Sequence, residues 1–230
     1  MLDFSRFEWL SFDCYGTLVD WESGISAAVD DVLRSHGMRR SRADILALFA
    51  AVEPRVQNSQ NFLEYRNVLR TTMAAIGTEL GIQCTESELN CLADTLPTWP
   101  IFADVTKALQ ALKARYKLAV ISNVDDDLFA GTARALNVEF DAVVTAEQAR
   151  SDKPNLRNFD VASKAMAVGK EAWLHIAESL FHDIEPANKL GITCVWVDRA
   201  GHGGATRRTD AVPDLVVPDL ATLAQIVGAT

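Results

Sequence analysis

Asp13 is the residue of this sequence most clearly suited to chemistry, because of the residues on either side of it. A mostly apolar run, Trp9-Leu10-Ser11-Phe12, precedes it, and Gly16 and Thr17 follow closely. A buried strand that ends in a carboxylate delivers that group to the carboxyl edge of a parallel sheet, where open α/β folds build their sites. A carboxylate placed there can act as the nucleophile of a covalent mechanism. The alternative is an aspartate that only caps the turn after a strand.

The stretch 13–17, Asp-Cys-Tyr-Gly-Thr, resembles the first motif of the haloacid dehalogenase (HAD) superfamily. Phosphatases of that superfamily have Asp-x-Asp-Gly-Thr, where the second aspartate is the general acid that protonates the departing alkoxide. This sequence has Tyr15 at that position. A halide leaves as a stable anion, and a protonated ring amine leaves unaided, so neither reaction needs the acid. The resemblance is therefore to the L-2-haloacid dehalogenase branch, with Asp13 as the nucleophile.

Two later motifs extend the resemblance. Ser122-Asn123 follows the apolar run 118–121 and matches the motif that holds the substrate, in which the asparagine of dehalogenase-like members helps to hold the leaving halide. Lys153-Pro154 matches the motif whose ammonium group points at the nucleophile, and a cation within ~4–6 Å keeps a partly buried carboxylate ionised. Without the resemblance, Ser122-Asn123 is also consistent with a helix N-cap, and Lys153 with an exposed residue before a helix that begins with proline.

The stretch 177–183, Ala-Glu-Ser-Leu-Phe-His-Asp, has the spacing of the motif whose acids bind Mg²⁺ in HAD phosphatases. Glu178 stands where metal-independent dehalogenases usually have a small polar residue. Three acids, at 13, 178 and 183, therefore face the one positive charge of Lys153, and desolvating surplus charge is costly. The remedies are a bound Mg²⁺, a raised pKa on one acid or a cationic substrate. A magnesium site would use Asp13, the Tyr15 carbonyl, Glu178 and Asp183.

Other positions depart from the dehalogenase branch. That branch has a cap arginine that holds the substrate, and the matching position here is Ala50, so that Arg55 or Arg66 is the candidate substitute. The branch also has a tyrosine six residues after the motif lysine, where this sequence has Phe159. The stretches 12–22 and 177–183 are also similar to the HAD hydrolase that opens azetidine-2-carboxylate. The cationic ring nitrogen of that substrate would suit the acidic Glu178.

The elements that must position these residues follow an α/β pattern. Short apolar runs alternate with helical patterns after residue 98, which indicates a parallel sheet covered on both faces. The expected strands are 9–12, 118–121, 142–144, 173–177, 193–197 and 215–217. Up to residue 97, apolar periodicity predicts a first helix with an apolar face over 25–33 that stops at His36-Gly37. It predicts further helices over 45–52, 62–76 and 86–96, with Pro54 between the second and third helices. We expect a Rossmann-like core domain from 1–17 and 98–230 and a helical cap domain, 18–97, inserted over Asp13.

Composition is that of an ordinary globular protein, since 49% of the 230 residues are hydrophobic and 23% are charged. The formal net charge of -9 argues against a nucleic-acid partner. No apolar run reaches the ~18 residues of a membrane span, and the N-terminus lacks a signal-peptide pattern. The four cysteines show no metal-type spacing, so we expect a cytoplasmic protein with reduced thiols. The glycine-rich loop 201–204 is expected to be flexible.

The sequence as a whole predicts a hydrolase that acts on a small 2-halocarboxylic acid through a covalent aspartyl ester. Asp13 attacks, Lys153 keeps it ionised, and water then hydrolyses the ester. Asp183 and Glu178 are expected to orient Lys153 or the water. Thr17, Tyr15, Ser122, Asn123 and Phe159 complete the expected site. No cofactor is required for this reaction.

Three alternatives stay open: ring opening of a cyclic imino acid, an Mg²⁺-dependent phosphatase or phosphonatase-like enzyme, and a non-catalytic relative. A homodimer is compatible with the resemblance.

Overall fold

A computed structural model describes residues 2–57, 62–199 and 209–229. The chain divides into two compact units. The core unit comprises Met1–Val19, Ile101–Asn123 and Leu136–Thr230, and the helical unit comprises Asp20–Pro100 and Val124–Ala135. The loop 201–204, which the sequence predicts to be flexible, lies outside the described residues.

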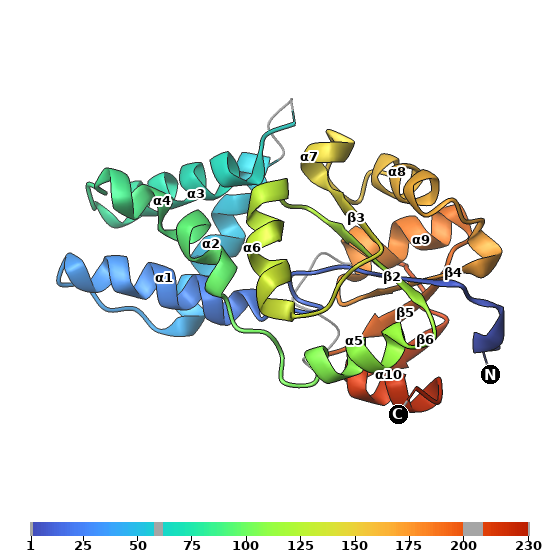
Figure 1. Ribbon diagram of the computed structural model, residues 1–230. Coiled ribbons are helices and arrows are strands. Elements are labelled where there is room, and N and C mark those ends of the chain that lie inside the picture. The colour runs from blue at the N-terminus through green and yellow to red at the C-terminus, as the bar shows by residue number, and fades with distance from the viewer. Residues whose placement is uncertain (1, 58–61, 200–208, 230) are drawn as a thin grey trace. The chain divides into compact units, whose positions relative to one another are not determined.

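A parallel sheet forms the centre of the core unit, and six of its strands lie within the described residues (Figure 1). The strand order is β3-β2-β1-β4-β5-β6. The strands are β1 (Trp9–Phe12), β2 (Lys117–Ser122), β3 (Ala142–Thr145), β4 (Trp173–Ala177), β5 (Thr193–Val197) and β6 (Leu215–Val217). Every residue of β1 and β4 is buried, as expected for continuous apolar runs in a sheet covered on both faces. The predicted α/β fold is confirmed.

Helices cover both faces of the sheet. α8 (Arg157–Met166) and α9 (Glu185–Leu190) lie on one face, and α5 (Val105–Lys113) and α10 (Leu220–Ile226) lie on the other (Figure 1). A buried cluster that includes Phe159, Met166 and Ile184 packs α8 and the segment before α9 against the strands. Each fully buried side chain of this size stabilises the fold by roughly 1.5–3 kcal/mol. A short helix α7 (Ala146–Ala149), 3₁₀ turns at Phe4–Arg6 and Lys170–Ala172, and a π-helical turn at Leu180–Ile184 complete the described core unit.

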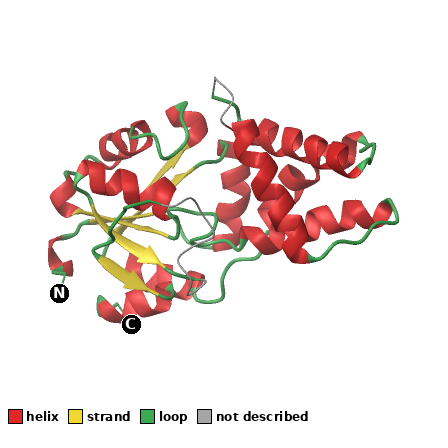
Figure 2. Cartoon of the chain, turned by 180° about the vertical axis from the view of Figure 1, so that it is seen from behind, coloured by secondary structure: helices red, strands yellow, loops and turns green. Residues whose placement is uncertain are grey.

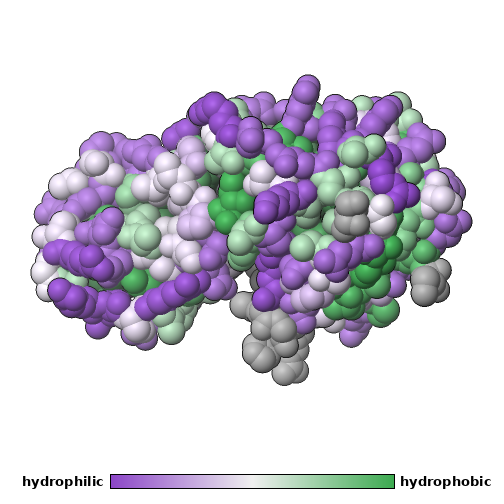
Figure 3. Space-filling view, turned by 60° about the horizontal axis from the view of Figure 1, so that its bottom comes forward, coloured by the Kyte–Doolittle hydropathy of each residue, from purple (hydrophilic) through white to green (hydrophobic). Residues whose placement is uncertain are grey.

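The helical unit contains α1 (Trp21–Ser35), α2 (Arg42–Gln57), α3 (Tyr65–Leu80), α4 (Glu86–Thr95), a 3₁₀ turn (Leu96–Thr98) and α6 (Asp126–Leu136) apart from its last residue (Figure 2). On the face drawn in Figure 3, hydrophilic side chains cover much of this unit, with apolar ones interspersed. This mixture is usual for protein surfaces. No helix in the described ranges is both long and apolar enough to cross a membrane.

Several predicted helix limits in this unit are wrong, most clearly around Pro54 and at the start of α3. Pro54 lies inside the last turns of α2 and does not separate two helices. A proline near a helix end removes one of the last hydrogen bonds but leaves the preceding turns intact. α3 begins at Tyr65 and not at Phe62, because the Asp125 carboxylate accepts hydrogen bonds from the N–H groups of Tyr65 and Arg66 at 2.7 and 2.8 Å. The sequence gives no local sign of this cap, which comes from a distant segment.

The central position of β1 determines where the chemical residues gather. β1 pairs with β2 on one side and β4 on the other, and Phe12 lies beside Val120 and Ile176. The N–H of Asp13 continues this ladder and donates to the Ile176 carbonyl at 3.1 Å. The segments that leave β1, β2 and β4 therefore start at one edge of the sheet. Open parallel sheets bind their ligands at this edge.

We predict that Gly24→Ala destabilises the protein by about 1–3 kcal/mol, the usual cost of overpacking. Gly24 of α1 lies against the Trp99 ring, and a Cβ at Gly24 would be 2.2 Å from Trp99 Cγ. Urea unfolding measures the effect. Ala27→Ser, on the exposed side of α1, is the control and should change the free energy of unfolding by less than about 0.5 kcal/mol. A Gly24→Ala protein as stable as the parent would contradict this packing.

Candidate active site

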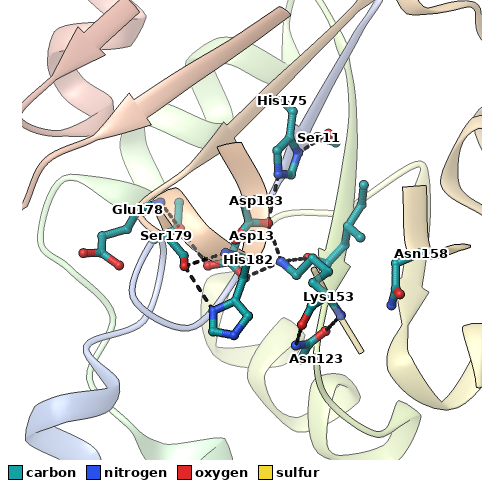
Figure 4. A network of polar contacts seen from close by, with 12 residues as sticks. Ser11, Asp13, Asn123, Lys153, Asn158, His175, Glu178, Ser179, His182 and Asp183 are labelled. Atoms are coloured by element: carbon teal, nitrogen blue, oxygen red, sulfur yellow. Dashed lines mark hydrogen bonds and ion pairs between the residues drawn. The ribbon is translucent and has the colours of Figure 1, made fainter. Parts of the chain in front are cut away.

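Lys153 lies at the centre of a buried ion-pair network in the core unit (Figure 4). Its ammonium group donates to Asp13 Oδ1 at 2.9 Å, to Asp183 Oδ1 at 2.6 Å and to the Ile121 carbonyl at 2.8 Å. An ammonium group has three donors, so these contacts use all of them. The side chains of Lys153, Asp13 and Asp183 are only 2%, 10% and 1% exposed. One cation therefore serves two carboxylates in a site with little access to water.

The second oxygen of Asp13 is held by Thr17. The Thr17 hydroxyl donates to Asp13 Oδ2 at 2.8 Å and accepts the N–H of Glu178 at 2.9 Å. The Glu178 carbonyl accepts in turn from Trp196 Nε1 at 2.8 Å. The turn that brings Thr17 back to Asp13 passes through Gly16, whose φ of 101° lies in the region that favours glycine. Both Asp13 oxygens are thus fixed by donors from different segments.

Asn123 holds the backbone of Lys153 at two points. Its Oδ1 accepts the Lys153 N–H at 2.7 Å, and its Nδ2 donates to the Lys153 carbonyl at 3.0 Å. The clamp joins the end of β2 to the segment that carries Lys153, so the Lys153 stem starts from a fixed place. Ser122 is buried at the end of β2, and its Oγ has no hydrogen-bond partner within the described ranges. That hydroxyl is available to a ligand.

Asp183 lies in the π-helical turn Leu180–Ile184, and its carboxylate is hydrogen-bonded to His175. His175 Nε2 lies 3.0 Å from Asp183 Oδ1, and His175 Nδ1 lies 2.7 Å from Ser11 Oγ. Neither Ser11 nor His175 is among the predicted site residues. A signal exists, however: each interrupts an otherwise apolar strand, and the two are direct neighbours in the register of β1 and β4.

The other predicted site residues lie around this network in different ways. Phe159 is fully buried in the core, with its ring centroid 5.1 Å from His175 and 6.2 Å from Trp173. Tyr15 is half-buried in the turn after β1 and bridges to Val19. In the helical unit, Arg66 pairs with Asp127 at 2.6 Å. Phe159 therefore packs the protein interior behind the network, and Arg66 is engaged by an acid of its own unit.

Glu178 contributes to the network through its backbone, while its side chain points away from Lys153 (Figure 4). Within the described part of the chain, no group of three His, Cys, Asp or Glu side chains is arranged to hold a metal ion. The space between Asp13 and Asp183 is taken by the Lys153 ammonium. The donor set expected for Mg²⁺, which needs Asp13, Glu178 and Asp183 together, therefore does not fit this arrangement.

The shared cation affects the two carboxylates differently. Burial raises the pKa of Asp13; the charge of Lys153 opposes this and the charge of Asp183 adds to it, leaving the pKa above its ordinary value. Burial also acts to raise the pKa of Asp183, but the charge of Lys153 and the hydrogen bond from His175 outweigh it and hold that pKa low. For Lys153, burial acts to lower the pKa, but both carboxylates hold it above its ordinary value. Asp183 is thus the carboxylate with the better stabilised charge, and Asp13 is the one with the less stabilised charge.

This arrangement has the parts of a nucleophilic site. A buried carboxylate with a less stabilised charge is more reactive toward an electrophilic carbon than one in water. The position two residues after Asp13 holds Tyr15, so the motif does not supply a second carboxylic acid for protonating a leaving group. The site therefore favours leaving groups that depart without a proton.

The family model of the haloacid dehalogenase-like hydrolases matches residues 8–191, which is well over half of the chain. The chain belongs to this family, and it is of the 2-haloacid dehalogenase type. The predicted membership of the HAD superfamily and of its L-2-haloacid dehalogenase branch is confirmed.

Relatives with known activities support the same assignment. The (S)-2-haloacid dehalogenase of Pseudomonas fluorescens is 28% identical over 220 residues, which cover 92% of each protein. A defluorinating L-2-haloacid dehalogenase has a similar fold, with a TM-score of 0.84 and 21% identity over 96% of this chain and 95% of its own. The L-2-haloacid dehalogenase of Xanthobacter autotrophicus, solved with chloropropionic acid covalently bound, has a TM-score of 0.82 and 21% identity, with 96% of this chain and 98% of its own covered.

We predict that removing the charge of Asp13 and removing the charge of Asp183, in separate variants, have unequal effects on stability. Asp13 has a raised pKa, so its ionised form is disfavoured by folding, and Asp13→Asn should leave the free energy of unfolding at neutral pH equal or higher. Asp183 has a lowered pKa, so it contributes stability above its unfolded pKa that is lost as the pH falls through the folded pKa. Asp183→Asn should therefore cost about 1–3 kcal/mol at neutral pH, and less in acid.

Urea unfolding of both variants at neutral and acidic pH measures these changes. Each variant is the control for the other, since each replaces one of the two carboxylates paired with Lys153 by an amide of the same shape. Equal destabilisation by the two substitutions would contradict the unequal sharing of Lys153.

Proposed function

We propose that this enzyme cleaves the carbon–halogen bond of a small 2-halocarboxylic acid by nucleophilic attack of Asp13. The observation that carries the proposal is the buried Asp13 carboxylate, held by Lys153 and Thr17, in a motif whose usual acid is replaced by Tyr15. Related proteins of similar length are (S)-2-haloacid dehalogenases. A covalently bound chloropropionic acid in one structural relative is consistent with an ester intermediate.

The first step forms a bond between an Asp13 oxygen and the carbon that bears the halogen. The carbon–halogen bond breaks, and the halide leaves with the electron pair. Lys153 keeps Asp13 ionised for this attack, and Thr17 fixes the orientation of the carboxylate. We assign Ser122 to the substrate or leaving group, because its buried Oγ has no partner among the described residues.

The second step hydrolyses the Asp13 ester. A water oxygen attacks Asp13 Cγ, and one water proton passes to Asp183 Oδ2, which is buried and has no hydrogen-bond partner within the described ranges. The bond between Cγ and the ester oxygen then breaks, and the 2-hydroxy acid takes that proton from Asp183. The remaining water proton is released from Asp13 to solvent. The products are a 2-hydroxy acid, a halide and a proton, and no cofactor takes part.

A second candidate reaction is hydrolytic ring opening of a cyclic imino acid such as azetidine-2-carboxylate. The observation that favours it is Glu178, a half-buried acid in the segment after β4. A ring nitrogen that carries a positive charge would be attracted to this acid. As Asp13 attacks the ring carbon, the C–N bond would break without further protonation, and the amine would stay tethered to the esterified chain. The same nucleophile and the same ester hydrolysis serve both reactions. We further propose that residues 18–97 act as the cap domain of a core formed by 1–17 and 98–230.

We predict that the purified enzyme releases chloride from L-2-chloropropionate in the presence of EDTA, and that Asp13→Asn abolishes the release. Asparagine keeps the shape of Asp13 but is not a nucleophile of comparable strength, so a folded Asp13→Asn protein is the matched control. Chloride release is measured with an ion-selective electrode. Activity that requires added Mg²⁺, or substantial turnover by Asp13→Asn, would overturn the mechanism. Turnover of azetidine-2-carboxylate without chloride release would select the second candidate.

We predict that kcat/KM falls as the pH decreases through the raised pKa of Asp13. Protonation removes the nucleophile, and kcat/KM reports the ionisation of the free enzyme. Because the pKa is raised, the loss should begin at a higher pH than for an ordinary carboxyl group. The raised pKa of Lys153 should delay loss on the alkaline side. A rate that stays constant across the acidic range, in a protein shown to be folded by circular dichroism, would contradict this.

A further inference from the structure

Two polar side chains lie side by side in the apolar interior of the sheet. Ser11 on β1 and His175 on β4 are fully buried and are partners in the strand register. Ser11 Oγ lies 2.7 Å from His175 Nδ1 and accepts from Trp173 Nε1 at 2.7 Å. Unpaired polar groups in such a place cost free energy, yet these groups are matched with one another. The chain of contacts ends at Asp183.

One protonation pattern of His175 matches every donor in this chain with an acceptor. Trp173 Nε1 is only a donor, so its contact uses a lone pair of Ser11 Oγ. With the single hydroxyl proton of Ser11 directed to its other contact, His175 Nδ1 acts as the acceptor. In this pattern His175 is neutral, carries its proton on Nε2 and donates that proton to Asp183 Oδ1. Every donor from Trp173 onward has one acceptor.

The same contacts determine how Asp183 is oriented. Asp183 Oδ1 accepts from both His175 and Lys153, at 3.0 and 2.6 Å, whereas Oδ2 has no partner among the described residues. The His175 ring is packed edge-on against Phe159 at a centroid distance of 5.1 Å, which restricts its rotation. Two donors on Oδ1 prevent the carboxylate from turning, so Oδ2 keeps one direction.

We propose that Ser11 and His175 are positioning residues that hold Asp183 for hydrolysis of the Asp13 ester. His175 acts through Asp183 and does not touch the reacting atoms. This inference rests on the proposed function, because it concerns the second step of that reaction. Within the described ranges, neither residue makes a hydrogen bond to the Asp13 side chain. Attack at the carbon therefore does not depend on them directly. Loss of His175 should slow ester hydrolysis more than ester formation.

The protonation pattern can be tested without any substrate. Long-range ¹H–¹⁵N spectra of protein labelled at histidine distinguish the two neutral tautomers from the imidazolium form, and the spectrum of His175→Gln identifies the signals of His175. We expect a neutral ring protonated on Nε2 near pH 7, and loss of this defined pattern in Ser11→Ala. A ring protonated on Nδ1, or a charged ring in the parent protein, would overturn the inference even if the enzyme is an active dehalogenase.

Rapid mixing of enzyme and L-2-chloropropionate, followed by mass spectrometry of the acid-quenched protein, tests the role in catalysis. In His175→Leu we expect chloride release in the first turnover to continue, while ester hydrolysis slows by up to about 100-fold and the Asp13 ester accumulates. His175→Gln keeps an amide donor near the position of Nε2 and should restore much of the hydrolysis rate. Ser11→Ala should accumulate the ester to an intermediate level.

Val195→Ala creates a cavity at a fully buried position of β5. This variant controls for loss of stability alone, and its Asp13 ester should not accumulate. Equal slowing of both steps in His175→Leu, or an unchanged hydrolysis rate, would overturn the positioning role. If the parent enzyme releases no halide, the proposed function fails, and the tautomer measurement still decides whether the hydrogen-bond chain exists.

Discussion

The sharing of one buried cation between two carboxylates is the interaction on which the site depends. Charges of +1 on Lys153 and −1 on each of Asp13 and Asp183 leave the trio with one excess negative charge, in surroundings where Coulomb interactions are much stronger than in water. The excess is not divided evenly, because His175 donates to Asp183 as well. Asp13 carries the less stabilised charge, which is the state that a nucleophile requires. Such a site costs some stability for the sake of reactivity, as functional sites commonly do.

The remaining structure keeps these three groups in place. The central position of β1 brings Asp13 between the ends of β2 and β4, and Asn123 clamps the Lys153 backbone to the end of β2. Glu178 belongs to this support through its N–H and carbonyl, which hold Thr17 and accept from Trp196. Its carboxylate points away from Lys153 (Figure 4), so the network itself contains two acids and not three. The charge imbalance that the sequence implies is thus smaller in the folded protein.

Much of the fold and part of the site are predictable from the sequence for physical reasons. Buried parallel strands are continuous apolar runs, so β1 and β4 are recognisable, and Asp13 stands out because a charged residue directly after such a run requires an explanation. Lys153 was predicted through the resemblance of Lys153-Pro154 to a family motif. The support of Asp183 by Ser11 and His175 was not predicted, because it depends on strand register between segments more than 160 residues apart. The start of α3 was missed for a similar reason, since Asp125 caps it from another segment. Local patterns predict elements, whereas contacts between distant segments require the fold.

The most direct test of the central claim is to follow oxygen during turnover in H₂¹⁸O. Repeated turnover of L-2-chloropropionate should place ¹⁸O in the carboxyl group of Asp13, since water attacks Asp13 Cγ and the ester oxygen leaves with the product. Mass spectrometry of the peptide that contains Asp13 detects this, and enzyme incubated in H₂¹⁸O without substrate is the control. A single turnover with excess enzyme should give a hydroxy acid whose new oxygen is unlabelled. Label in the product of a single turnover, with none in the Asp13 peptide, would mean that water attacks the substrate directly and would contradict the account.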